Sequence, residues 1–277
     1  MLGAIVLAAV VTTTTAQGLC VVEHCSKQLL ECQLDSVCRE WSNCNTGCGM
    51  GPKSLPCQIR CADLYKPTDA TADKINLFSE CVISLHHCVP QMRQHCPTPS
   101  NTLKRLDLAE LGGEWFITRG WNPMFDCFDC QHHNFTLGAS SEAKPLHGDL
   151  KYRVKMDLEC TYPNCTYLQR EVFQSFAQPD PAVQGHLTNH NNSLAELHYS
   201  DDWFVLAAKA DTFALVYYCG CNDATCGYSG SVLYTRSASY NDLDAGDKAA
   251  IAAAVSGAQV ADFEFATMCY PDNRACA

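Results

Sequence analysis

The sequence predicts a mainly β protein: an eight-stranded barrel, preceded by a disulfide-rich, mainly helical module and followed by a carboxy-terminal helix. Eleven of the 20 cysteines lie between Cys20 and Cys96, a density typical of a small module cross-linked by disulfides. The segment Gly113-Glu114-Trp115 opens a run in which apolar and polar residues alternate. Such a run is typical of the first strand of a small ligand-holding barrel, and further alternating segments follow it.

The composition is that of a globular protein. Of the 277 residues, 47% are hydrophobic and 18% are charged, which excludes a disordered chain. The formal net charge of −11 and the lack of a Lys- or Arg-rich run argue against nucleic acid as a partner. Ten histidines accompany this acidity, so the charge of the protein should change strongly around pH 5 to 6.

Residues 1–18 read as a targeting segment. A short apolar run, too short to span a membrane, is followed by threonines and a small-residue site near Ala16. The first Lys or Arg is Lys27, so the usual basic start of a signal is missing. We expect a mature chain that begins near Gln17 and resides in an oxidising compartment.

The first module spans residues 19–96. Its cysteines recur at intervals of about seven along segments that read as short helices, at residues 23–32 and 78–84. Zinc is disfavoured because these cysteines form no paired C-x-x-C clusters and have no histidines placed as partners. We therefore predict disulfides, and no metal, for Cys20, Cys25, Cys32, Cys38, Cys44, Cys48, Cys57, Cys61, Cys81 and Cys88.

A proline-bearing linker at residues 97–105 leads into the barrel at residues 106–240. Turns rich in Asn, Asp, Gly and Pro separate eight alternating segments, at residues 114–119, 132–137, 150–156, 167–176, 194–199, 203–209, 213–219 and 231–237. Eight such strands match a barrel whose interior can hold one small ligand. Residues 241–277 should form an alanine-rich helix near residues 245–255 and a cysteine-containing tail.

Several segments carry a family resemblance, in the same order along both modules. They are CQIRCADL at 57–64, EWFIT at 114–118, NPMFDCFDCQ at 122–131, HYSDDW at 198–203, VYY at 216–218 and GSVLYTRS at 230–237. Together they resemble the violaxanthin de-epoxidase family. The resemblance implies a lipocalin-like barrel of the chloroplast thylakoid lumen, with a secreted protein as the runner-up. It also implies reduction of epoxy-xanthophylls with ascorbate as co-substrate, switched on by acid.

The resemblance places the catalytic acid in the pair Asp201–Asp202. Opening an epoxide needs a proton on its oxygen, and a carboxylic acid kept protonated in an apolar cavity can supply that proton. Neighbouring strand residues face opposite sides, so only one of the two can point inward. We favour Asp202. Tyr218 and Tyr234 are further catalytic candidates as hydrogen-bond donors, although barrel tyrosines are often core residues.

By the same resemblance, Gln131 should hold the ascorbate. Asp126 and Asp129 should anchor a loop near the pocket, and Trp203 should contact substrate. Three histidines match family positions linked to acid activation: His133, His190 and His198. A neutral imidazole that becomes charged near pH 6 can change an interface or open a lid. The expected partners are the thylakoid lipid surface, at acidic pH, and a second copy of the chain in a pH-dependent homodimer.

The chain also departs from the family pattern. Cys127, Cys219, Cys221 and Cys226 stand where the family enzyme has other residues, and we expect them to form two added disulfides at the barrel mouth. This pattern resembles the de-epoxidase-like or de-epoxidase-related branches, of which some members rearrange the epoxide. Three functions therefore stay open: an ascorbate-dependent de-epoxidase, a redox-neutral tautomerase or isomerase of epoxy-carotenoids, and a carotenoid or lipid carrier without chemistry.

Overall fold

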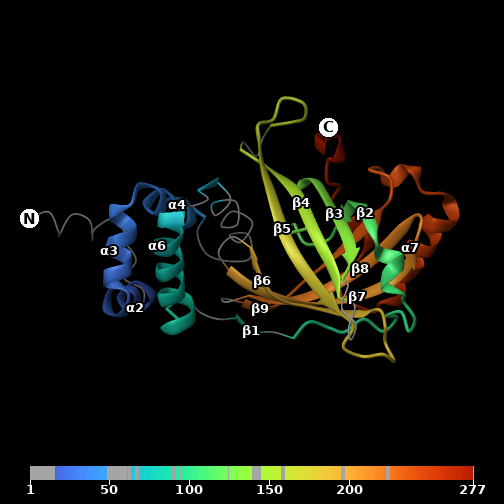
Figure 1. Cartoon of the computed structure of the whole chain (residues 1–277), viewed down its shortest axis with the longest axis horizontal. Helices are drawn as coiled ribbons and strands as arrows, with labels where there is room; N and C mark the ends of the chain where they lie inside the picture. The colour runs from blue at the N-terminus through green and yellow to red at the C-terminus, as the bar shows by residue number, and fades with distance from the viewer. Residues whose placement is uncertain are drawn as a thin grey trace, which may run out of the picture. The chain divides into compact units, whose positions relative to one another are not determined.

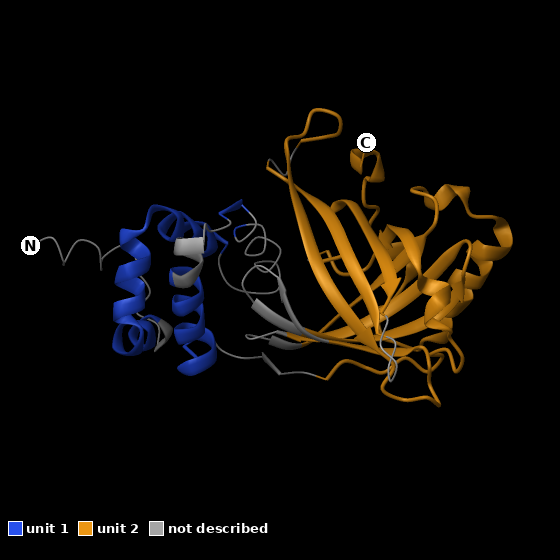
Figure 2. Ribbon diagram, in the orientation of Figure 1, with its two compact units in different colours: residues 1–93, 223–226 blue, residues 94–222, 227–277 orange. Residues whose placement is uncertain are grey.

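The computed structural model describes residues 16–48, 61, 64–65, 69–88, 92–93, 95–123, 125–138, 145–156, 160–194, 197–222 and 225–276. The chain divides into two compact units (Figures 1 and 2). The first comprises residues 1–93 with 223–226, and the second comprises residues 94–222 with 227–277. Most of the predicted targeting segment, residues 1–15, lies outside the described residues.

The first unit is helical, and its core is built largely from cystine. Its elements are α2 (Ala16–His24), α3 (Ser26–Leu34), α4 (Ser36–Gly47), α6 (Asp69–Ser79), the π-helix η1 (Glu80–Leu85) and the short strand β1 (Met92–Arg93). The Asp35 carboxylate accepts hydrogen bonds from the backbone N–H groups of Val37 and Cys38, both at 3.0 Å, and so caps α4. Lys74 on α6 pairs with the same carboxylate at 3.1 Å.

Disulfides join these helices, as predicted. The bonds within this unit are Cys20–Cys88, Cys25–Cys81, Cys32–Cys38 and Cys44–Cys61. Cys48 is disulfide-bonded too, whereas Cys57 lies outside the described residues. Cys25, Cys32 and Cys38 have no exposed surface, so sulfur takes the place that aliphatic side chains take in a larger domain.

The second unit contains an eight-stranded antiparallel barrel (Figure 1). Its strands are β2 (Gly113–Gly120), β3 (Asp129–Leu137), β4 (Leu146–Lys155), β5 (Tyr167–Ala177), β6 (His186–Leu194), β7 (Leu197–Lys209), β8 (Phe213–Asn222) and β9 (Thr225–Thr235). Each strand pairs with the next along the chain, and β9 pairs with both β8 and β2. The ring is therefore closed, which leaves no sheet edge among these strands. The predicted fold class is confirmed.

One strand prediction is wrong. The predicted strands at 194–199 and 203–209 belong largely to one continuous strand, β7, and β6 was missed. The consecutive acids Asp201 and Asp202 suggested a turn where the chain in fact stays extended. β6 is rich in Asn, which has low strand propensity. It is held by antiparallel pairing with β7, for example Leu187 opposite Trp203.

Two apolar layers surround the barrel wall. Inside, Trp115, Phe135, Phe176 and Trp203 form the core with neighbouring aliphatic residues. The Trp115 indole N–H donates to the Leu111 carbonyl at 2.7 Å, so its polar edge is satisfied while the ring is buried. Outside, α7 (Ala245–Gly257) packs on β7 and β8, as its alanine-rich sequence predicts. Asp244 caps this helix by accepting from the Asp247 N–H at 2.7 Å.

Disulfides also attach the carboxy-terminal segment to the barrel. Cys127 bonds Cys269 and Cys130 bonds Cys276, while Cys269 forms an isolated bridge with Gly120 of β2. The further bonds of this unit are Cys96–Cys219 and Cys160–Cys165. The expectation that the added cysteines pair among themselves is therefore wrong for Cys127 and Cys219. Within the described ranges, no helix is long and apolar enough to cross a membrane.

Candidate functional site

A cavity lies inside the barrel and opens to solvent, with an empty volume of about 610 Å³ that includes its open part. Its lining is mostly apolar and aromatic, with a small set of polar groups. The lining residues are Ile117, Phe125, Asp126, Phe128, Gln131, His133, Leu150, Tyr152, Val172, Gln174, Asp201, Trp203, Tyr218, Tyr228, Val232 and Tyr234. This lining, mostly apolar with a few polar groups, is typical of a small-molecule site.

Asp126 is one of two buried carboxyl groups in this cavity. Its residue is 2% exposed, and the Tyr218 hydroxyl donates to its Oδ1 at 2.8 Å. The backbone N–H groups of Asn122 and Ser231 donate to its Oδ2 at 2.8 and 3.3 Å. Three donors converge on this carboxyl from the loop after β2, from β8 and from β9. Both of its oxygens are therefore engaged.

Asp201 is the second buried carboxyl, and it enters from β7. Its residue is 7% exposed, and its Oδ1 accepts a hydrogen bond from the Tyr228 hydroxyl at 2.9 Å. Asp202 points the other way: its side chain is 47% exposed, and its Oδ1 lies 3.1 Å from Nε2 of His186. The prediction that Asp202 is the inward residue is wrong. Strand alternation puts Asp201 on the same face as the core residue Trp203.

Burial changes the proton affinity of both carboxyls. Loss of hydration raises the pKa of Asp126 to about 7, against the lowering effect of its hydrogen-bond donors. The same cause raises the pKa of Asp201 to about 7, against the hydrogen bond from Tyr228, while the charge of Asp126 raises it further. Loss of hydration also raises the pKa of Tyr218 well above its ordinary value. Both carboxyls can therefore carry a proton in mildly acidic solution.

Three glycines make room for these groups. A Cβ atom at Gly220 would lie 2.1 Å from Asp201 Oδ1 and 2.4 Å from the Tyr228 ring, and one at Gly230 would lie 2.2 Å from the Tyr218 hydroxyl. A Cβ at Gly120 would lie 2.3 Å from the Asp126 backbone oxygen. Side chains at these positions would displace one or other carboxyl–tyrosine pair. The paired arrangement is thus built into the backbone.

His133 is a buried structural residue of the cavity wall. Its Nε2 lies 2.6 Å from Gln174 Oε1, and its Nδ1 lies 2.7 Å from the Tyr234 hydroxyl. A neutral ring satisfies both contacts by donating to Gln174 and accepting from Tyr234. Burial lowers the pKa of His133 to about 3, so the expectation that it senses pH near 6 is wrong. The side chains of His190 and His198 lie outside the described part of the structure.

Gln131 and Tyr234 line the cavity. The Gln131 Nε2 donates to the Phe125 carbonyl at 2.7 Å, whereas its Oε1 is buried and has no hydrogen-bond partner among the described residues. The Tyr234 hydroxyl directs its proton to His133. Tyr234 therefore presents its oxygen, rather than its proton, to a ligand in this arrangement.

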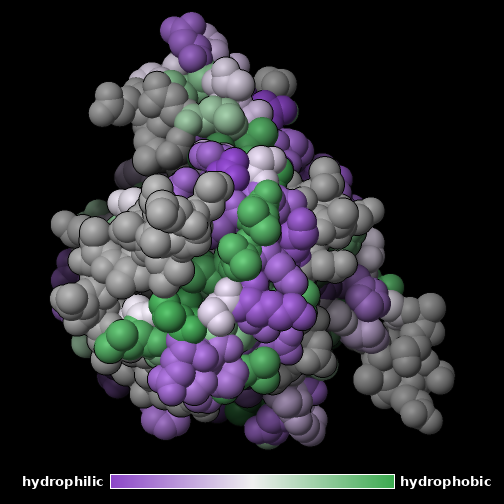
Figure 3. All heavy atoms as spheres, turned by 90° about the vertical axis from the view of Figure 1, so that its left-hand side faces the viewer, coloured by the Kyte–Doolittle hydropathy of each residue, from purple (hydrophilic) through white to green (hydrophobic). Residues whose placement is uncertain are grey.

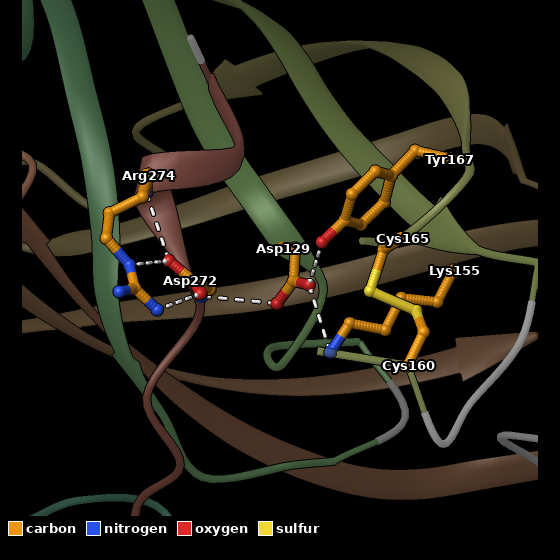
Figure 4. A network of polar contacts seen from close by, with 7 residues as sticks. All are labelled: Asp129, Lys155, Cys160, Cys165, Tyr167, Asp272 and Arg274. Carbon is orange, nitrogen blue, oxygen red and sulfur yellow. Dashed lines mark hydrogen bonds and ion pairs between the residues drawn. A yellow bond between two sulfur atoms is a disulfide. The ribbon is translucent and has the colours of Figure 1, made fainter. Parts of the chain in front are cut away.

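Asp129 does not line the cavity, contrary to its expected place beside the pocket. Figure 4 shows its carboxylate in a network at the start of β3. Its Oδ2 accepts from Tyr167 at 3.0 Å and pairs with Lys155 at 3.2 Å. Its Oδ1 accepts from the Asp272 backbone N–H at 3.2 Å, and Arg274 pairs with the Asp272 carboxylate. Asp129 therefore helps to hold the carboxy-terminal segment against the barrel.

Sequence reasoning missed Tyr228, Tyr152 and Gln174, which also line the cavity. Tyr228 had a usable signal. It lies six residues before Tyr234 on β9, and an even spacing along one strand places both side chains on the same face. The predicted strand began only at residue 231, so this spacing was not applied.

The two buried carboxyls predict a pH-dependent stability. Their pKa is raised above the unfolded value near 4, so the native state binds their protons more tightly. Their stabilising contribution is complete below about pH 4 and is lost as the pH rises towards 7. It amounts to roughly 4 kcal/mol for each carboxyl at most. Denaturant unfolding should therefore give a higher free energy of unfolding at pH 5 than at pH 7.5.

Asn resembles a protonated carboxyl and does not titrate, so Asp126→Asn and Asp201→Asn should each flatten this dependence. The control is Asp202→Asn, because that side chain is about half exposed and lies outside the cavity. Parallel curves for all four proteins would contradict the account of the buried pair.

Comparison with known sequences places the chain in a family. A family model for the VDE lipocalin domain matches residues 17–273. The chain is 40% identical over 228 residues to violaxanthin de-epoxidase, chloroplastic, from Spinacia oleracea. The aligned region makes up 79% of this chain and 44% of that protein. The namesake proteins from Nicotiana tabacum and Arabidopsis thaliana are 37% and 34% identical over 227 and 226 residues, again over 79% of this chain. The chain spans less than half the length of these relatives.

Solved structures of similar shape are more distant. Lobster apocrustacyanin A1 is 16% identical with a TM-score of 0.40, over 59% of this chain and 78% of that one. Insecticyanin from the tobacco hornworm Manduca sexta is 12% identical with a TM-score of 0.43, over 65% of this chain and 87% of that one. The family model and the curated relatives, each covering most of the sequence, show that the chain belongs to the violaxanthin de-epoxidase (VDE) lipocalin domain family.

Proposed function

We propose that the barrel binds one end of an epoxy-xanthophyll and reduces its epoxide with ascorbate, as a de-epoxidase. The observation that carries this proposal is Asp201, a buried carboxyl with a raised pKa that faces an apolar cavity. Such a group supplies a proton under mildly acidic conditions, and an epoxide oxygen must be protonated as its carbon–oxygen bond breaks. The membership of the VDE lipocalin domain family supports the same reaction class.

The cavity suits an apolar ring with one polar edge. Ile117, Leu150 and Val172 supply aliphatic surface, and aromatic rings complete most of the wall. A ring of this kind gains about 25 cal/mol for each Å² of apolar surface that it buries. The carboxyls then lie on a wall that has little water to compete for their hydrogen bonds. We infer that the substrate enters by its epoxide-bearing end.

The hydrogen-bond donors separate the roles of the two carboxyls. Asp126 accepts three hydrogen bonds, and among the described residues Asp201 accepts one, from Tyr228. Donors stabilise the ionised form of a carboxyl, and two coupled carboxyls give up their protons in sequence. When the pair holds one proton, that proton therefore resides mainly on Asp201. In that singly protonated state, Asp201 is the proposed acid and Asp126 is ionised.

One polar group of the cavity could hold ascorbate. The buried Oε1 of Gln131, which has no partner in the described part of the chain, is an acceptor that a hydroxyl group could satisfy. Gln131 would therefore hold the reductant, as the family resemblance implies. Ascorbate, when bound as its monoanion, would supply two electrons and one proton and become dehydroascorbate. Asp201 would supply the second proton, so that the epoxide oxygen leaves as water, and solvent would then return a proton to Asp201. Asp201 contributes the proton at the epoxide oxygen, and the apolar wall excludes bulk water from that step.

A redox-neutral rearrangement is the second candidate, and the second carboxyl favours it. In that reaction the epoxide oxygen stays in the product as a hydroxyl group, and a base removes a proton from carbon. Asp201 would protonate the oxygen, and the ionised Asp126 in the same cavity would accept the carbon proton. No electrons are exchanged, so ascorbate would not be needed.

We also propose a chloroplast location, supported by the word chloroplastic in the names of the curated relatives, and more narrowly the thylakoid lumen.

Attachment to a lipid surface at acidic pH and a homodimer are further proposals. Figure 3 shows hydrophobic side chains at the surface bordered by hydrophilic ones. The first unit exposes Leu30, Leu34 and Leu85, at 54%, 76% and 61%. Such side chains can contact a lipid surface.

The test is product analysis after incubation of the purified protein with violaxanthin at pH 5, with and without ascorbate. The proposal predicts a de-epoxidised product that requires ascorbate. A rearranged product that forms without ascorbate would replace the proposal with the second candidate. Binding without any product would reduce the protein to a carrier.

A further inference from the structure

Tyr228 contacts the proposed acid and belongs to the cavity wall. Its hydroxyl donates to Asp201 Oδ1 at 2.9 Å. Its ring lies 6.4 Å from the Tyr218 ring at an interplanar angle of 71°, and 5.2 Å from the Phe125 ring. Gly220 leaves the space in which the carboxyl and the phenol meet. Packing and the absence of a side chain thus hold the hydroxyl at one particular carboxyl oxygen.

This contact decides where the proton of Asp201 lies. Oδ1 accepts the Tyr228 proton, so in the acid form of Asp201 the carboxyl proton resides on Oδ2. Without this donor, either oxygen could carry the proton, and only one orientation would present it to a ligand. The arrangement across the cavity is similar, since Tyr218 donates to Asp126 Oδ1 at 2.8 Å.

We propose that Tyr228 is a positioning residue, which holds the carboxyl of Asp201 so that Oδ2 presents the proton to the substrate. The inference rests on the proposed function, because it assigns a role towards the acid of that reaction. Nothing in the family resemblance assigned a role to this tyrosine. Its even spacing from Tyr234 on β9 and its hydrogen bond to Asp201 single it out.

The sign of the effect follows from the charged form of Asp201. A donor stabilises the carboxylate, so removal of the Tyr228 hydroxyl should raise the pKa of Asp201. The other titratable groups on the cavity wall are Asp126, His133, Tyr152, Tyr218 and Tyr234, and Asp202 is the chain neighbour. Of these, Asp126 and Asp202 raise the pKa of Asp201 by their charge. Tyr228→Phe leaves all of these groups in place.

The first arm of the test is the pH profile of de-epoxidation. Activity should fall as the pH rises and Asp201 ionises, and this fall is the alkaline limb of the profile. We expect Tyr228→Phe to shift this limb upward by about one pH unit, since a hydrogen bond to a charged group contributes on the order of 1.5–3 kcal/mol before compensation. The value of kcat should fall about tenfold with little change in KM, because the acid loses its orientation and not the binding surface.

Tyr217 and Tyr218, which lie on β8 and not on β9, serve as comparison sites for the same Tyr→Phe change. Tyr217→Phe removes a buried hydroxyl on the outer side of the barrel wall, so the limb should stay where it is. Tyr218→Phe removes a donor from Asp126, which then protonates more readily and repels the charge of Asp201 less. The limb should therefore move slightly downward. Tyr228→Gln keeps a donor and loses the ring, so it separates the hydroxyl from the packing and should restore the wild-type limb in part.

The second arm needs no substrate. The pH dependence of the free energy of unfolding, compared between wild type and Asp201→Asn, reports the pKa of Asp201 through proton linkage. The difference in free energy of unfolding between wild type and Asp201→Asn changes with pH around the pKa of Asp201. When both proteins also carry Tyr228→Phe, the pH at the midpoint of that change should rise by the same amount as the alkaline limb of the activity profile. An activity loss with an unmoved limb and midpoint would overturn the proposal and leave Tyr228 as a packing residue. If no variant turns over substrate, the proposed function fails, and the second arm still decides the role of Tyr228.

Discussion

Asp201→Asn should lower kcat for epoxide opening by about 100-fold to 10,000-fold, whereas Asp202→Asn should keep most of the activity. A positioned general acid contributes this range of rate enhancement, and Asn has the shape of the acid without its labile proton. Asp201 is buried in the cavity wall, while Asp202 faces outward and pairs with His186. The two neighbours therefore differ only in the face of β7 that they occupy.

The measurement is the initial rate at pH 5 for both variants beside wild type, with xanthophyll binding followed separately. Binding should persist in Asp201→Asn, since the apolar wall is unchanged. Equal losses in the two variants, or a wild-type rate in Asp201→Asn, would remove Asp201 from the role of acid.

Reduction of the disulfides should unfold the first unit and abolish activity. The buried core there is largely cystine: Cys25, Cys81 and Cys88 form one cluster with Val82, and Cys32 with Cys38 forms another. Loss of the Cys25–Cys81 bond, with a sequence separation of 56, should cost about 4 kcal/mol from loop-closure entropy. A unit of this size has few other buried contacts with which to offset that loss.

The check is thermal unfolding followed by circular dichroism, for the double variant Cys25→Ser/Cys81→Ser. The matched control is Cys160→Ser/Cys165→Ser, whose bond spans a separation of only 5 and should cost about 2 kcal/mol. Thiol titration of the native protein should find few or no reactive thiols. Ten or more, or equal destabilisation by the two double variants, would contradict this account of the first unit.

The barrel could be predicted because its signals are local. Alternation along β4 and β5, and turn residues between strands, reveal a half-buried strand without knowledge of its partners. The segment of β6 gave no such signal. Its order depends on hydrogen bonds to β7, a tertiary effect that strand propensity does not contain.

Within the site, strand parity would have identified two residues. Asp201 lies two positions before the buried Trp203, so both point inward once β7 is recognised as continuous. The same count from Tyr234 leads to Tyr228. The predicted strand began only at Trp203, so the alternation from Trp203 back to Asp201 was missing from the choice between the two acids.

Other features could not be obtained from the sequence. The sequence does not reveal that His133 is buried, because histidines occur both inside proteins and on their surfaces. Its pKa is lowered by burial in the folded barrel. The pairing of Cys127 with Cys269 joins residues with a sequence separation of 142, and cysteine count alone allows many connectivities. Asp129 lies three residues after Asp126, yet its carboxylate contacts the carboxy-terminal segment and not the cavity.

The protonation state of Asp201 tests the central claim most directly. Isotope-edited infrared spectroscopy of protein labelled at the aspartate carboxyls distinguishes a protonated carboxyl from a carboxylate. The Asp126→Asn background simplifies the assignment, and the further substitution Asp201→Asn identifies the band. We predict a protonated carboxyl band at pH 5 that disappears with a midpoint near pH 7, slightly lower once the Asp126 charge is gone, and that is missing from the double variant. An Asp201 that is fully ionised at pH 5 would contradict its role as the acid.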